Sequence, residues 1–125
     1  MKRIIIFTNN PAAAMKYEMT GSVKFTGGPV INVLNAARDA VRKGAELISN
    51  PLPGHTRHGL SPYRSVAVSQ AESHLDFSSL RRIEDAMAAY KKDVGLKYKA
   101  YNDAILADFK TEDIELLDAA LRGGE

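Results

Sequence analysis

The sequence predicts a three-layer α/β protein: a small, mostly parallel sheet of about four strands flanked by helices, with a helical C-terminal third. Two observations carry this prediction. Short β-favouring runs alternate with helical patterns through the first seventy residues, and only helical patterns follow them. The chain has 125 residues, which suffices for one hydrophobic core but not for two. We therefore expect a single domain over residues 1–125.

Four apolar runs predict the strands. The first, Arg3–Phe7, contains consecutive β-favouring residues rather than an alternating pattern, which indicates a strand buried on both faces. The other three are Val23–Phe25, Leu47–Ile48 and Val66–Val68. Continuous runs of this kind are typical of a central parallel sheet, so we expect the strands to be mostly parallel.

Caps and apolar spacing predict the helices. Asn9 or Asn10 can cap a short helix over Ala12–Met19, because Pro11 suits a first helical position. The segment Val30–Lys43 places its apolar residues on one face, and Gly44 follows where a helix can end. In the last third, the sequence predicts three helices: Phe77–Val94, Tyr98–Phe109 and a final one capped by Thr111.

Composition excludes several classes of protein. The chain has no cysteine, which excludes disulfides, thiolate metal sites and a thiol nucleophile. The N-terminal apolar run is four residues long, shorter than a signal-peptide core, and no segment approaches the roughly 20 apolar residues of a membrane span. The sequence has neither the spacing of a zinc finger nor a basic tail, so nothing in it indicates nucleic-acid binding. We expect a cytoplasmic protein without a membrane or nucleic-acid partner.

The loop between Leu47 and Ser69 is the most distinctive stretch. No acidic residue occurs between Glu46 and Glu72, whereas the loop carries His55, Arg57, His58 and Arg64. Residues 1–71 have a net charge of +6, and residues 72–125 have −4. Guanidinium groups bind carboxylates and phosphates in a bidentate manner, so the loop favours a small anionic ligand. A solvated basic loop without a ligand is the alternative.

Polar residues follow each predicted strand, as Thr8-Asn9-Asn10, Thr26-Gly27-Gly28, Ser49-Asn50-Pro51 and Ser69-Gln70. The carboxyl ends of parallel strands converge, so we expect these segments to share a polar pocket for small anions or amides. Helix caps and turns are the alternative role. The candidate ligand-binding residues are Thr8, Asn9, Asn10, Gly27, Gly28, Asn50, Gly54, His55, Arg57, His58, Tyr63, Arg64 and Ser65.

No catalytic constellation is evident. No serine lies in a nucleophile elbow, and the candidate pocket contains no paired acids. His55 and His58 without a nearby carboxylate make half a metal site at most. We therefore predict no catalytic residue, metal or cofactor, and a binding protein rather than an enzyme. Two alternatives stay open: a small enzyme acting on a phosphorylated or carboxylated metabolite, and an interaction module that uses its C-terminal helices.

Several of these motifs together resemble the GrdX family. They are Thr-Asn-Asn-Pro at Thr8–Pro11, Lys43-Gly44 at the helix end, Asn-Pro-Leu-Pro-Gly at Asn50–Gly54 and Ser-Pro-Tyr-Arg-Ser at Ser61–Ser65. The resemblance runs in order through residues 3–69. Asn50 stands in place of a histidine before Pro-Leu, and Gly59-Leu60 replaces a more polar segment.

GrdX proteins are encoded beside the glycine, sarcosine and betaine reductases of anaerobic amino-acid fermentation. The resemblance implies a non-catalytic accessory protein of such a system, with no catalytic residues to transfer to this chain. Its partners would be the reductase components, a small anion, or a second copy of the chain in a homo-oligomer. The absence of cysteine agrees, because this chain cannot take part in thiol chemistry itself.

Overall fold

The computed structural model describes residues 3–19, 22–51, 61–70, 75–97 and 101–123. Its elements are β1 (Arg3–Thr8), α1 (Pro11–Tyr17), β2 (Ser22–Phe25), α2 (Val30–Arg42), β3 (Glu46–Leu47), β4 (Ser65–Gln70), α4 (Phe77–Lys97) and α5 (Asp103–Gly123). The predicted α/β class, the number of strands and the helical last third are confirmed. Gly54, His55, Arg57 and His58 lie outside the described residues.

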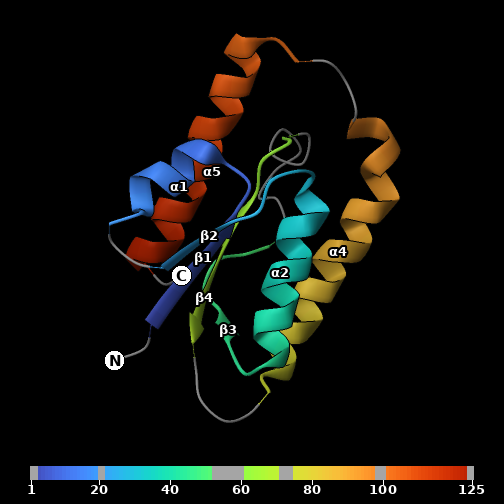
Figure 1. The fold of residues 1–125 in the computed structure, drawn as a ribbon. Helices are drawn as coiled ribbons and strands as arrows, with labels where there is room; N and C mark the ends of the chain where they lie inside the picture. The colour runs from blue at the N-terminus through green and yellow to red at the C-terminus, as the bar shows by residue number, and fades with distance from the viewer. Residues whose placement is uncertain (1–2, 20–21, 52–60, 71–74, 98–100, 124–125) are drawn as a thin grey trace.

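The four strands form one mixed sheet in the order β2-β1-β4-β3 (Figure 1). β1 and β2 are parallel, whereas β4 runs antiparallel to both β1 and β3. The prediction of a mostly parallel sheet is therefore wrong. The sequence between Leu47 and Ser65 carries no helical pattern, and a parallel neighbour needs a long crossover connection, usually a helix. β4 instead pairs with β3 in the antiparallel direction.

Both faces of the sheet are covered by helices, because successive side chains of a strand point to opposite sides. Ile5 and Phe7 of β1 face α2 and α4 in the larger apolar core. Ile6 points the other way, where it packs with Leu117 of α5. Figure 1 shows the same division, with α1 and α5 on one side of the sheet and α2 and α4 on the other.

Helix α2 agrees with its predicted pattern. Its buried residues are Val30, Val33, Leu34, Ala37 and Val41. Lys43 is its C-cap, and Gly44 follows with a φ of 110°. An ordinary side chain disfavours that backbone conformation, so Gly44 ends the helix as expected.

The last third has two helices where three were predicted. Gly95 does not end α4, and Thr111 lies inside α5 rather than capping a helix. A single glycine costs a helix only about 1 kcal/mol relative to alanine, which packing along the rest of α4 can offset. Among the described helices, none has a stretch long and apolar enough to cross a membrane.

Gly28 adopts a conformation that only glycine takes easily, with φ at 95°. We expect Gly28→Ala to lower the free energy of unfolding by about 1 to 2 kcal/mol, because a Cβ strains this backbone. The new Cβ would also lie 2.9 Å from Asn32 Nδ2. Urea denaturation would measure the loss.

Gly27→Ala is the matched control, since a Cβ there meets Phe25 Cε2 at an ordinary 3.7 Å. Equal losses in the two variants would contradict the role of the Gly28 backbone.

Candidate functional site

Three strands end, and a fourth begins, at one edge of the sheet. β1 and β2 end there together, and β4 starts there because it runs the opposite way. We call this region the strand-end edge and define it by residues 8–10, 26–28, 49–51 and 61–65. The predicted convergence is thus confirmed for the segments after β1, β2 and β3. It is wrong for Ser69-Gln70, which lies at the opposite edge because β4 is antiparallel.

The side-chain amide of Asn9 joins three segments of the strand-end edge. Its Nδ2 donates to the carbonyl oxygens of Gly28 and Pro62, each at 2.9 Å. Its Oδ1 accepts from the backbone N–H of Arg64 at 2.9 Å. The amide is buried and uses both donors and its acceptor. Asn9 therefore fixes the turn after β2 against the entry to β4.

A buried polar network lies beside it, on the face covered by α5. The hydroxyl oxygens of Thr8 and Ser65 are 2.7 Å apart. Ser65 Oγ donates to Asp113 Oδ2 at 2.6 Å, and Asn10 Nδ2 donates to the same oxygen at 3.1 Å. Asn10 also donates to the Lys110 carbonyl at 3.1 Å, and its Oδ1 caps α1 by accepting from Ala12. The network ties α5 and α1 to the ends of β1 and β4.

Asp113 is the charged member of this network, and it is 2% exposed. Burial raises the pKa of its carboxyl above the usual value, against the opposing effect of the hydrogen bonds from Ser65 and Asn10 and of the nearby Arg64 charge. Sequence analysis missed this residue as a member of the site. A signal existed, since Asp113 stands between Phe109 and Leu117 at helical spacing, in line with two buried residues.

Arg64 contributes a second buried charge, and only 3% of it is exposed. Its Nη1 donates to the Pro51 carbonyl at 2.8 Å, which joins β4 to the segment after β3. Its Nε is buried and has no hydrogen-bond partner among the described residues. Burial lowers the pKa of the guanidinium, while the Asp113 carboxylate and Tyr90 oppose that shift.

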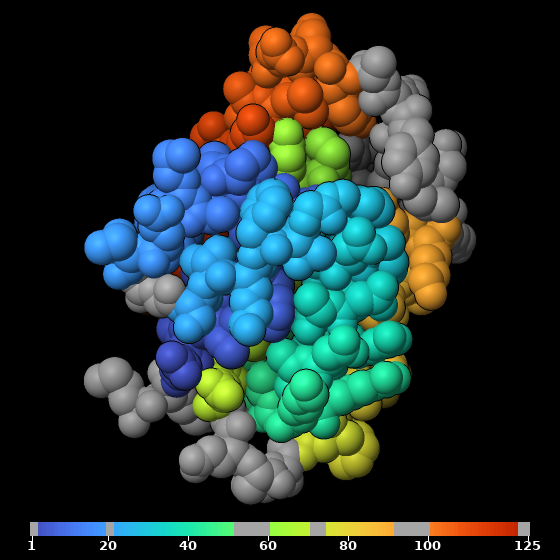
Figure 2. Space-filling model, in the orientation of Figure 1, coloured from blue at the N-terminus to red at the C-terminus, as the bar shows by residue number. Residues whose placement is uncertain are grey.

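Tyr63 and Lys110 lie at the outer side of the strand-end edge. The Lys110 ammonium is 5.7 Å from the centre of the Tyr63 ring, within reach of a cation–π interaction. Tyr63 is half-buried, and its backbone N–H donates to Ser61 Oγ at 3.0 Å. Figure 2 shows the segment that enters β4, in light green, at the surface between the beginning of α2 and α5. This part of the edge therefore lies at the molecular surface (Figure 2).

Of the predicted site residues, the structure brings together Thr8, Asn9, Asn10, Gly28, Tyr63, Arg64 and Ser65. Gly27 and Asn50 are exposed beside them.

A family model described as GrdX-like protein matches residues 5–122, nearly the whole chain. The chain belongs to the GrdX-like protein family. No curated protein and no solved structure gives a significant match. The family resemblance predicted from the loop motifs is confirmed.

The buried hydroxyls of this GrdX-like protein are placed to hold structure. Thr8 is fully buried and Ser65 is 7% exposed, and both hydroxyls are engaged in the network with Asp113. No three His, Cys, Asp or Glu side chains gather as a metal site would need within the described part of the chain. One donor in the region, the Arg64 Nε, is left without an acceptor among the described residues.

Proposed function

We propose that this GrdX-like protein is a non-catalytic binding protein that takes a small carboxylate at the strand-end edge. We further propose that it acts as an accessory of a glycine, sarcosine or betaine reductase. Family membership over residues 5–122 supports the accessory role. The ligand proposal rests on one observation, the buried Arg64 Nε that lacks an acceptor among the described residues.

A buried donor without an acceptor is costly, about 1 to 3 kcal/mol, and more when the group is charged. A carboxylate oxygen at Nε would complete the hydrogen bonding of the guanidinium. It would also oppose the effect of burial, which disfavours the charged form of Arg64. Arginine suits this role because its planar fork presents donors in the geometry of a carboxylate.

The surroundings of Arg64 are held rigid before a ligand arrives. Asn9 fixes the Arg64 backbone through its N–H, and the Pro51 carbonyl fixes one end of the guanidinium. A preorganised group loses little conformational entropy on binding, so even a small anion can bind specifically. The Asp113 carboxylate is already engaged, since its Oδ2 accepts from Ser65 and Asn10.

A thermal-shift panel of acetate, glycine, sarcosine, betaine and phosphate tests the ligand proposal. A carboxylate at a hundred times its dissociation constant should add about 2.7 kcal/mol of stability. In a domain of this size that raises the melting temperature by on the order of 10 °C. Arg64→Lys should abolish the shift, because lysine keeps the charge but lacks the Nε donor and the fork.

Arg42→Lys is the matched control, since Arg42 is exposed and forms a 3.6 Å ion pair with Glu84 far from the strand-end edge. Its ligand response should equal that of the wild type. A flat panel, or a shift that survives in Arg64→Lys, would refute carboxylate binding at this site. Co-sedimentation with purified reductase components tests the accessory role separately, and no co-sedimentation with any component would count against it.

A further inference from the structure

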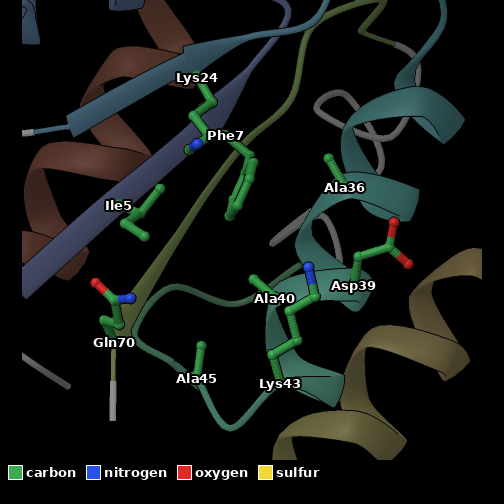
Figure 3. A pocket seen from close by; sticks show the side chains of 9 residues that line it. All are labelled: Ile5, Phe7, Lys24, Ala36, Asp39, Ala40, Lys43, Ala45 and Gln70. Atoms are coloured by element: carbon green, nitrogen blue, oxygen red, sulfur yellow. The ribbon is translucent and has the colours of Figure 1, made fainter. Parts of the chain in front are cut away.

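A groove lies beside α2, on the face of the sheet opposite α5. Its volume is about 270 Å³, and nine residues line it (Figure 3): Ile5, Phe7, Lys24, Ala36, Asp39, Ala40, Lys43, Ala45 and Gln70. The groove follows from the sheet order. α2 packs over β1 and β4, while β2 is the edge strand beyond β1. The face of β2 beside α2 is therefore left for a groove.

The floor of the groove is apolar. Ile5 and Phe7 of β1 are two residues apart, so their side chains point to the same face. Ala36 and Ala40 lie one helical turn apart on α2 and face them. Because both α2 residues are alanines, the helix leaves space above the strand that larger side chains would fill.

The rim of the groove is cationic and polar. Lys24 of β2 pairs in register with Phe7, and Lys43 follows the end of α2 on the other side. Neither ammonium forms an ion pair with a described residue. Figure 3 shows the Asp39 carboxylate pointing away from the sheet, whereas the Lys24 side chain reaches down beside Phe7.

We propose that this groove binds a small amphipathic carboxylate, with its hydrocarbon part on Phe7 and Ala40 and its carboxylate between Lys24 and Lys43. A volume of about 270 Å³ equals the space of roughly nine water molecules. That suits a carboxylic acid of about six to eight carbons and is smaller than a typical drug-sized site. The amide of Gln70 is a further donor at the rim.

This groove is a different site from the carboxylate site proposed above. Its Gln70 end stands at the opposite end of β4 from Arg64, about 20 Å of strand away, whereas its Phe7 end pairs with Val66, nearer Arg64. The chemistry of the two sites also differs. Arg64 is buried among polar contacts, which suits a small anion, whereas the groove has an apolar floor for a hydrocarbon chain beneath exposed lysines. A ligand for one site is therefore a poor match for the other.

NMR titration with acetate, butyrate, hexanoate and octanoate tests the proposal. Affinity should rise roughly fourfold per methylene until the groove is full, because each buried methylene adds to binding. The amide resonances of Phe7, Ala36 and Ala40 should shift more than those of Asn9 and Arg64. Hexanol, which lacks the carboxylate, should bind more weakly than hexanoate.

Three variants locate the ligand. Lys24→Gln and Lys43→Gln should each weaken hexanoate binding about threefold to fivefold, as expected for a partly exposed ion pair. Ala40→Met should weaken it at least tenfold by filling the groove, and the open rim lets the fold accept the larger side chain. Lys91→Gln is the matched control, an exposed lysine on α4 that does not line the groove.

Affinity that does not depend on chain length would overturn the proposal. An equal loss in Lys91→Gln and Lys24→Gln would do the same, since it would indicate unspecific attraction to surface charge. Shifts at Asn9 and Arg64 with none at Ala40 would move hexanoate to the strand-end edge and exclude the groove. That result leaves the function proposed for Arg64 standing.

Discussion

Replacing Asn10 by alanine is expected to lower the free energy of unfolding by about 3 kcal/mol. The loss combines two effects. The first is the cap of α1, where Asn10 Oδ1 accepts from Ala12 at 3.0 Å, worth typically 1 kcal/mol. The second is the loss of the hydrogen bonds that Asn10 donates to the Asp113 carboxylate and the Lys110 carbonyl, and a hydrogen bond to a charged group contributes about 1.5 to 3 kcal/mol. Urea denaturation followed by circular dichroism measures the change.

Asn102→Ala separates the two effects. Asn102 Oδ1 accepts from Ile105 at 2.9 Å and caps α5, but its side chain is exposed. Its loss should be about 1 kcal/mol, the worth of a cap alone. If Asn10→Ala costs no more than Asn102→Ala, then the contacts of Asn10 with α5 do not stabilise the fold, and the network loses its structural role.

Local signals in the sequence predicted local structure well. The Asn9-Asn10 pair before Pro11 correctly placed the start of α1, where the cap is Asn10, and Gly44 correctly placed the end of α2. In both cases the physical cause is confined to a few neighbouring residues, a capping oxygen or a backbone angle that only glycine accepts easily. Such causes can be recognised from the chain itself without knowledge of the packing.

Strand direction needed a different kind of information. Ile6 and Phe7 of β1 and Val66–Val68 of β4 are buried, and an apolar run that covers both faces of a strand looks the same whether the neighbouring strands are parallel or antiparallel. The absence of a helical pattern between Leu47 and Ser65 was the available evidence for an antiparallel strand. The resulting error moved Gln70 to the wrong edge of the sheet.

The helices of the last third show how packing overrides a local signal. Thr111 precedes two acids and therefore resembles an N-cap, yet α5 continues through it. The buried side of α5 continues past Thr111, because it is formed by Phe109, Asp113 and Leu117 at helical spacing. No proline or glycine interrupts the helix before Gly123. Burial of this side against the sheet outweighs the preference of Thr111 for a cap.

The sequence predicted the residues of the candidate site that lie at the strand ends, but not the residue that α5 contributes. Thr8 and Asn9 were identified because polar residues at strand ends are a recognised pattern, and Ser65 because it closes the Ser61–Ser65 loop motif. Asp113 comes from α5, 48 residues after Ser65, and only the fold brings the two together. An acidic residue on the apolar side of a predicted helix is the sequence signal for a buried carboxylate of this kind.

Asp113→Ala should lower the free energy of unfolding by about 3 kcal/mol at pH 7. Ser65 and Asn10 lose their acceptor, and the buried Arg64 loses the carboxylate that opposes its burial. Removing one partner of buried opposite charges is strongly destabilising because the remaining charge is left uncompensated. Asp118→Ala is the matched control on α5, a partly exposed acid paired with Lys16 at 2.6 Å, and should cost less than 1 kcal/mol.

Asp113→Ala also tests how the stability contributed by Asp113 changes with pH. The pKa of Asp113 is raised in the folded state, so the folded protein binds this proton more tightly than the unfolded chain does. The contribution of Asp113 to stability is then fully present below the unfolded pKa, near 3.9, and decreases as pH rises through the folded pKa. The stability difference between wild type and Asp113→Ala should therefore widen as pH falls from 7 toward 4. The effects of the other carboxyl groups on stability cancel, because the measurement compares the pH–stability curve of the wild type with that of Asp113→Ala. A stability difference that narrows as pH falls would mean that the hydrogen bonds and the Arg64 charge affect the pKa of Asp113 more than burial does.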